Sequence, residues 1–255
     1  NPALTNQLFG KFRILTELVP GVNKLVLRSG KDELPLAIEY KPQTNSYIVR
    51  AIYLTDNTGA TDYQTPLPND PQDYAAKMDT MMKLIQTFSA ERLNDLGFGR
   101  ATFNLELDEQ GKVKVHVFKC AAPADTYYKM NDQAWWANIA GQLERKLPTR
   151  KGKNLAVAAY TRYDPETKKA RGHTALGGGG LALFGSGNMF AWPSKLADAQ
   201  AAFMNETPID PARVFSDSVG RHTFWAAAST TIGAVLHELC HTFGLPHSRE
   251  PPDIM

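Results

Sequence analysis

The chain has 255 residues, which is enough for one large domain or for one domain with a small second one. Hydrophobic residues make up 43% of it and charged residues 21%, as in ordinary globular proteins. The net charge of +2 is uninformative by itself. The basic patch formed by residues 145–146 and 150–153 is typical of a solvated helix end and loop, so we expect no nucleic-acid partner. No apolar stretch approaches the length of a membrane span.

Cysteine usage is sparse. Cys120 and Cys240 are too few for a disulfide framework, and both stand among apolar residues, as buried free thiols do. This favours an intracellular protein. The chain begins with Asn1 rather than methionine, so it is a processed or excised chain and secretion stays open. The sequence also leaves the oligomeric state open.

The first 44 residues are rich in β-formers. Short apolar runs at residues 12–18, 25–27 and 34–40 are separated by turn residues, which predicts three short strands. Three strands are too few to close a core. We therefore expect residues 1–44 to be the end of a β-sandwich or a segment packed on the next domain, and residues 45–255 to form the main domain.

A buried strand and a long helix are predicted next. Residues 47–55 are rich in β-branched and aromatic side chains. Asp70 is the expected cap of the helix, Pro71 its first helical position and Asp73 part of its first turn, and Gly97 marks its end. The apolar stripe of this helix consists of Met78, Met81, Met82, Ile85 and Phe88.

Strands and helices then alternate. Residues 102–107 and 113–117 alternate in polarity around a turn, which predicts a hairpin. A second helix is expected from Asp132 to just before Pro148, and a strand at 155–160. This order predicts an α/β (α+β) domain with a mixed, twisted sheet.

A glycine run at residues 177–180 follows. A phosphate cradle would need a lysine–serine pair and a helix after it, and neither is present. A nucleotide site is therefore not expected.

The most informative stretch is residues 237–247, which has the pattern H-E-x-x-H-x-x-G-x-x-H. On a helix, His237 and His241 share a face and can chelate one ion. Glu238 can reach a water at that ion, and Gly244 suits a helix end that turns His247 back as a third ligand. Three protein ligands with a fourth open position are the pattern of a catalytic Zn²⁺. Cys240 borders this face, so a role as an extra ligand or a redox switch stays open.

The same helix is predicted to be amphipathic, with its apolar residues and its two histidines on opposite faces. Its apolar residues project away from the two histidines and form one stripe: Ile232, Val235, Leu236, Leu239 and Phe243. We therefore expect a helix that is buried on one face and carries ligands on the other.

The motif resembles that of the metzincin clan of zinc endopeptidases, in which a turn carrying a methionine follows the third histidine. The resemblance implies a metzincin-like zincin fold, with two packed helices above the active-site helix. It implies that His237, His241 and His247 bind one catalytic Zn²⁺, that Glu238 is the general base, and that Met255 lies beneath the metal.

In the clan, the edge strand of the sheet binds an extended peptide by main-chain pairing. By resemblance, residues 176–184 take this role, because glycines beside the strand would let a peptide backbone approach closely. The residues assigned to it are Leu176, Gly178, Gly180, Leu181 and Leu183.

Further stretches are similar to an uncharacterised family of zinc metallopeptidases of fungi and other eukaryotes. They are residues 86–91, 97–100, 173–185 and 192–194, together with the zinc helix. The resemblance implies a peptide or protein substrate and adds no more detail about it.

The leading hypothesis is a zinc endopeptidase, a hydrolase. One alternative is a zinc-binding scaffold without activity that acts as an interaction module, although an intact Glu238 speaks against it. Another is a zinc hydrolase of a non-peptide amide, which the sequence does not distinguish. His173 and His222 are candidates for supporting roles at the site, and each is more often an ordinary surface or hydrogen-bonded histidine.

Overall fold

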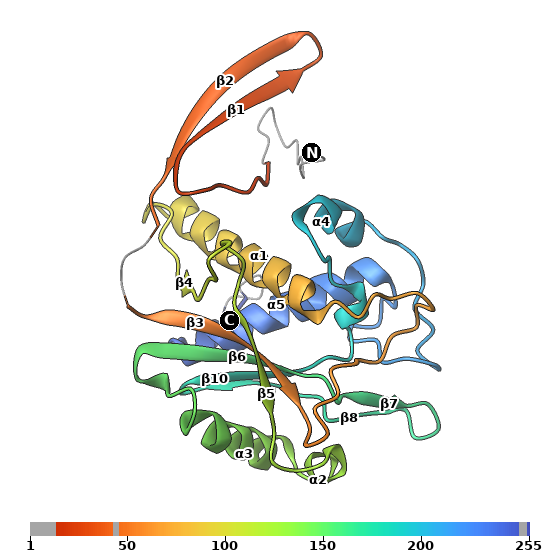
Figure 1. Ribbon diagram of the computed structural model, residues 1–255. Helices are drawn as coiled ribbons and strands as arrows, with labels where there is room; N and C mark the ends of the chain where they lie inside the picture. Colours follow the sequence, from red (N-terminus) through yellow and green to blue (C-terminus); the bar gives the residue numbers. More distant parts are fainter. Residues whose placement is uncertain (1–13, 43–45, 250–253) are drawn as a thin grey trace.

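A computed structural model describes residues 14–42, 46–249 and 254–255. Its centre is a mixed sheet with helices on both faces (Figure 1). The strand order is β4-β3-β6-β10-β9, and β5 also pairs with β3. The strands are β3 (Ile48–Thr55), β4 (Asn104–Leu105), β5 (Val115–Lys119), β6 (Gly152–Ala158), β9 (Ala175–Gly178) and β10 (Leu181–Gly185).

The strands of this sheet pair in parallel, except that β9 runs antiparallel to β10 at the edge of the sheet. The interior strands β3, β6 and β10 are almost entirely buried, as expected for parallel strands covered on both faces. The expected fold class, a mixed sheet with packed helices, is confirmed.

One face of the sheet is covered by α1 (Tyr74–Asp95) and α5 (Phe224–Thr242), and the other by α2 (Ala124–Tyr128) and α3 (Asp132–Glu144). Alternate residues of β10 serve the two cores: Ala182 and Phe184 face α1 and α5, whereas Leu181 and Leu183 face α3. The smaller elements are η1 (Thr149–Lys151), β7 (Arg162–Asp164), β8 (Lys169–Arg171), η2 (Met189–Ala191) and α4 (Leu196–Phe203).

The predicted start of α1 was wrong by one turn. Asp73, not Asp70, caps the helix, accepting a hydrogen bond from the amide of Ala76 at 3.0 Å. Asp70 instead accepts hydrogen bonds from the Tyr63 hydroxyl at 2.7 Å and from the amide of Gln72 at 3.0 Å. Gln72 has a φ of 57°, which a helix cannot continue through, so the helix begins after it.

The hairpin predicted over residues 102–117 was also wrong. β4 and β5 are two pieces of one edge strand, and both run parallel to β3. Between them the chain makes a short excursion closed by an isolated antiparallel bridge from Leu107 to Val113. Alternating polarity located the strand residues but could not show that a third strand, β3, pairs with both.

The N-terminal part has two strands where three were expected. β1 (Gly21–Ser29) and β2 (Asp32–Tyr40) form an antiparallel hairpin that projects from the body (Figure 1). Residues 14–18 are not a strand, and the beginning of that predicted strand lies outside the described residues. Within the described part of the chain, β1 and β2 pair only with each other, so no sandwich is formed there.

Candidate metal centre

The site is built on the last turns of α5. Its expected apolar stripe is confirmed for Ile232, Val235, Leu236 and Leu239, which are all buried in the core shared with α1. Phe243, at the end of the stripe, is 41% exposed and contacts the ring of Phe103. Burial of this stripe fixes the rotation of the helix, so the histidines must face outward.

A turn at the end of α5 brings the third histidine to the other two. Gly244 has a φ of 84°, and its amide donates to the carbonyl of His241 at 3.0 Å. The amide of Leu245 donates to the carbonyl of Cys240 at 3.2 Å. This pair of bonds is the Schellman arrangement, which needs a left-handed residue where Gly244 stands. Gly244 therefore ends the helix as predicted.

The three imidazoles meet at their Nε2 atoms. His237 and His241 are 3.2 Å apart at these atoms, His237 and His247 also 3.2 Å, and His241 and His247 3.1 Å. Two nitrogens bound tetrahedrally to one Zn²⁺ at its usual bond length lie about 3.3 Å apart. The triangle therefore has the dimensions of three ligands on one ion.

The opposite ring nitrogens show which tautomers are present. Nδ1 of His237 faces the carbonyl oxygen of Ile254, and Nδ1 of His241 lies 2.9 Å from the carbonyl oxygen of Leu245. A carbonyl only accepts, so both Nδ1 atoms carry a proton, and in the neutral rings both Nε2 atoms present lone pairs. Two lone pairs 3.2 Å apart repel each other unless a cation lies between them. The residues present therefore fit a zinc ion, and the two carbonyls orient its ligands.

Sequence reasoning missed these two carbonyls. A backbone acceptor has no signature in its residue type, and Ile254 lies 17 residues from His237 in the sequence. Met255, the expected floor of the site, is half-buried beside Ile254. Its role beneath the metal stays a prediction.

Glu238 is buried, with 9% of its surface exposed. Its backbone lies directly under the edge strand β9: a Cβ atom added to Gly177 would stand 2.1 Å from the carbonyl oxygen of Glu238. The edge strand β9 therefore runs beside the helix turn that carries Glu238 and His237.

The structure corrects the assignment of residues 176–184 to one edge strand. They form a β9–β10 hairpin, and of the five residues assigned to peptide binding only Leu176 and Gly178 lie on the edge strand β9. Leu181 and Leu183 lie in β10, between β6 and β9, with their side chains buried against α3. Gly180 belongs to the connection, where a side chain would collide with Thr149. The glycine run at residues 177–180 thus supplies the last two residues of β9 and the two-residue connection to β10.

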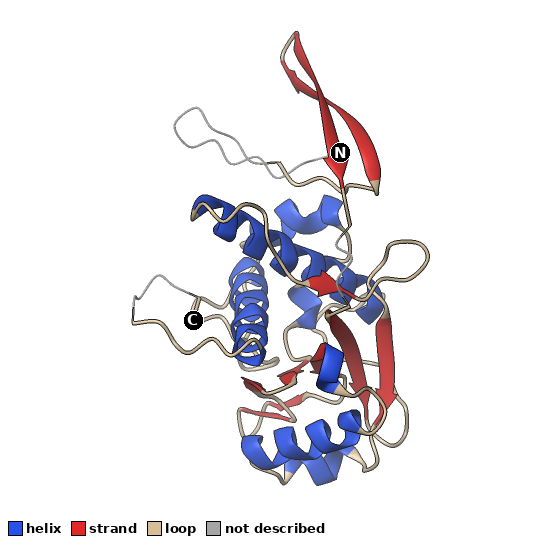
Figure 2. Cartoon of the chain, turned by 90° about the vertical axis from the view of Figure 1, so that its left-hand side faces the viewer, coloured by secondary structure: helices blue, strands red, loops and turns tan. Residues whose placement is uncertain are grey.

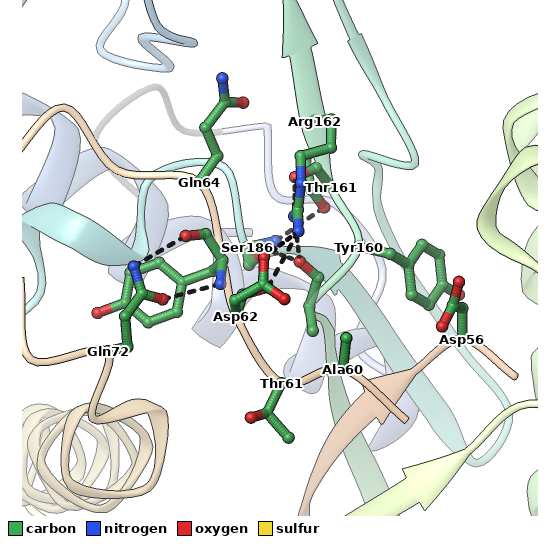
Figure 3. A network of polar contacts seen from close by, with 12 residues as sticks. Asp56, Ala60, Thr61, Asp62, Gln64, Gln72, Tyr160, Thr161, Arg162 and Ser186 are labelled. Carbon is green, nitrogen blue, oxygen red and sulfur yellow. Dashed lines mark hydrogen bonds and ion pairs between the residues drawn. The ribbon is translucent and has the colours of Figure 1, made fainter. Parts of the chain in front are cut away.

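A polar network lies in the turn that follows β6 (Figure 3), and one of its hydrogen bonds reaches the segment before β9. The Thr161 hydroxyl donates to the carbonyl of Gly172 at 2.5 Å and accepts from the amide of Ser186 at 3.0 Å. Arg162 donates to the Asp62 carboxylate at 2.6 Å. These bonds tie the segments before β9 and after β10 to the same turn, so the edge strand is held at one end.

Among the described residues, the cluster of possible metal ligands contains neither His222 nor His173. His222 precedes the first residue of α5, about 20 Å along the helix axis from His237, and its Nδ1 lies 3.1 Å from the Ser216 hydroxyl. His173 packs edge-on against Phe215, and its Nδ1 is enclosed without a hydrogen-bond partner.

Cys240 packs against the core on the side of α1, and burial raises the pKa of its thiol. The metal-competent cluster found among the described residues consists of the three histidines and does not include it. The extra-ligand role considered for Cys240 therefore has no support in the geometry.

The fold is that of zincin-type metallopeptidases. It superimposes on crystal structures of OgpA from Akkermansia muciniphila, the wild-type enzyme with a TM-score of 0.54 and 16% identity, over 82% of this chain and 51% of that one. A catalytically inactive OgpA in complex with an O-glycopeptide substrate gives a TM-score of 0.53 over the same shares.

Sequence comparison gives the family. A family profile described as "Putative peptidase family" matches residues 3–255, and the chain belongs to this family. A Schizosaccharomyces pombe protein named as a putative zinc metalloproteinase is 30% identical over 96% of this chain and 43% of its own length. A Saccharomyces cerevisiae protein of the same description is 39% identical over 31% of this chain and 12% of its own. The chain thus spans less than half the length of these relatives, and the predicted resemblance to fungal zinc metallopeptidases is confirmed.

No helix in the described ranges is both long and apolar enough to span a bilayer.

Proposed function

We propose that this chain carries the catalytic centre of a zinc-dependent endopeptidase, with His237, His241 and His247 as ligands and Glu238 as general base. The observation that carries the proposal is the triangle of Nε2 atoms at 3.1–3.2 Å, two of them with lone pairs turned inward. Membership of a peptidase family supports the reaction class.

Bound zinc would supply Lewis acidity toward a scissile carbonyl and toward water. Glu238 takes a proton from the attacking water and later delivers it to the leaving amine nitrogen. The free edge of β9, with Leu176 and Gly178, binds an extended peptide by main-chain pairing, which holds the peptide beside α5. Met255 supports the ligands from below, as the resemblance to metzincins implies.

The Glu238→Gln variant tests the mechanism. It removes the base but keeps the size of the side chain, so we expect stoichiometric zinc and a rate of peptide cleavage reduced by about 10³-fold, within the range that proton transfer contributes. Zinc content is measured by elemental analysis, and cleavage by mass spectrometry of a peptide library that includes O-glycosylated members. Wild-type protein with and without a chelator is the control.

The outcomes separate the competing functions. Cleavage by Glu238→Gln at the wild-type rate would exclude Glu238 as the base. A wild-type protein that binds zinc and cleaves nothing in the library would favour the interaction scaffold, and hydrolysis of small amides alone would favour a non-peptide substrate.

A further inference from the structure

Gly177 is the point at which the sheet touches the active-site helix. A Cβ atom built on it would lie 2.1 Å from the carbonyl oxygen, 2.7 Å from the carbonyl carbon and 2.8 Å from the Cα atom of Glu238. All three are backbone atoms of a helix whose apolar stripe is buried, so they cannot swing aside as a side chain would. The strand and the helix approach this closely only because residue 177 has no side chain.

The register of the hairpin directs this contact. Gly177 pairs with Ala182, which faces the core of α1 and α5, whereas Gly178 pairs with Leu181 on the α3 side. Accordingly, a Cβ on Gly178 would meet nothing within 4 Å. Two neighbouring glycines thus differ completely in what a methyl group would do.

We propose that Gly177 is a positioning residue that sets the gap between the edge strand and the helix turn carrying Glu238. The inference rests on the proposed peptidase function. The position of β9 sets how far a peptide paired with it lies from α5. The distance from the scissile carbonyl to Glu238 and to the ligands therefore depends on the gap between β9 and α5. A methyl group at residue 177 forces the strand and helix apart by about 1 Å, and a misplacement of that size costs about 10²-fold in rate.

The central experiment is the Gly177→Ala variant. Its kcat is expected to fall about 10²-fold. Its zinc stoichiometry should match the wild type, because the three ligands all lie on α5 and the turn after it. Affinity for an uncleaved peptide, measured by fluorescence anisotropy in the Glu238→Gln background, should change only a few-fold. A merely structural role would lower peptide affinity, zinc content and kcat together.

Two other glycines serve as comparisons. Gly178→Ala reports the cost of a methyl group on the edge strand itself, without a clash, and we expect a much smaller loss of kcat. Gly141→Ala lies on α3, where a Cβ also meets nothing within 4 Å, and it controls for the substitution as such. A Gly177→Ala variant with wild-type kcat, or with the same loss as Gly178→Ala, overturns the proposal.

A measurement on the wild-type chain covers the case in which Gly177→Ala does not fold. Amide hydrogen exchange is followed with zinc and with a chelator. Because β9 rests on the backbone of Glu238, we expect zinc to slow exchange at residues 175–178 as well as in α5. An effect confined to α5 contradicts the contact. This readout does not depend on cleavage, so failure of the proposed peptidase activity is distinguished from failure of the role of Gly177.

Discussion

At the scale of single residues, the candidate centre depends on atoms that side-chain chemistry does not reveal. His237 and His241 come from the motif, but their inward-facing lone pairs are set by the carbonyls of Ile254 and Leu245. A carbonyl oxygen is a neutral acceptor, so it selects the Nδ1–H tautomer without adding a charge to the site. The candidate ligands are therefore oriented before a metal binds. The histidine pattern was predictable from the sequence, whereas its orientation was not.

His173 gives a prediction about pH. Burial lowers its pKa from 6.5 to about 4. As the pH falls below 6.5, the unfolded chain binds a proton that the folded chain refuses until about pH 4, so folding stability falls across this window. We expect the free energy of unfolding to fall more steeply with decreasing pH in the wild type than in His173→Gln. The two slopes should differ by about 1.4 kcal/mol per pH unit.

Urea unfolding of both proteins between pH 6.5 and 4.5 checks this prediction. The difference between the two curves is used because every other titratable group is common to both proteins. Parallel curves would show that His173 accepts a proton in the folded chain.

At the scale of elements, helix α5 was predicted almost completely and the two edge strands were not. The helix could be predicted from a local pattern. Its apolar residues recur at helical spacing, which requires one buried face, and all four are buried: Ile232, Val235, Leu236 and Leu239. The edges of the sheet depend on partners distant in sequence. β4 and β5 became one interrupted strand because β3 pairs with both, and β9 is an edge only because β10 pairs with β6.

The excursion between β4 and β5 is anchored by Asp79 of α1. This nearly buried carboxylate accepts a hydrogen bond from the amide of Val113 at 2.8 Å and pairs with Lys83 at 3.0 Å. In Asp79→Ala the buried amide of Val113 loses its acceptor, so we expect a loss of about 1–3 kcal/mol in the free energy of unfolding.

The matched control is Lys112→Ala. Lys112 reaches the same carboxylate at 3.6 Å, but its side chain is 56% exposed, so its loss is expected to cost less than about 1 kcal/mol. Denaturant titrations compare the two variants. Equal losses would mean that the charge pair, rather than the amide bond, holds the excursion.

At the scale of the whole molecule, the β1–β2 hairpin stands apart from the domain that carries the site. Figure 2 shows it extending beyond the helices, and most of its side chains are at least partly exposed. The division predicted at residue 44 stays a prediction, and the lone hairpin among the described residues is compatible with it.

A variant that starts at residue 46 tests the division. Because the described strands β1 and β2 pair only with each other, we expect this variant to bind one zinc ion and to melt within about 4 °C of the full chain. Differential scanning calorimetry with and without zinc measures both effects. A loss of cooperative melting would show that residues 1–45 complete the core.

The sequence by itself determined the candidate metal-binding residues, the helix that carries them, the turn at Gly244 and the class of the fold. These follow from spacing, periodicity and φ preferences, which act within a few residues. Only the tertiary structure decided that Gly177 touches Glu238, that Ile254 orients His237, and that Leu181 and Leu183 are core rather than edge residues. Such features depend on which segments, far apart in the sequence, come into contact in the fold. A local pattern of residue types does not contain that information.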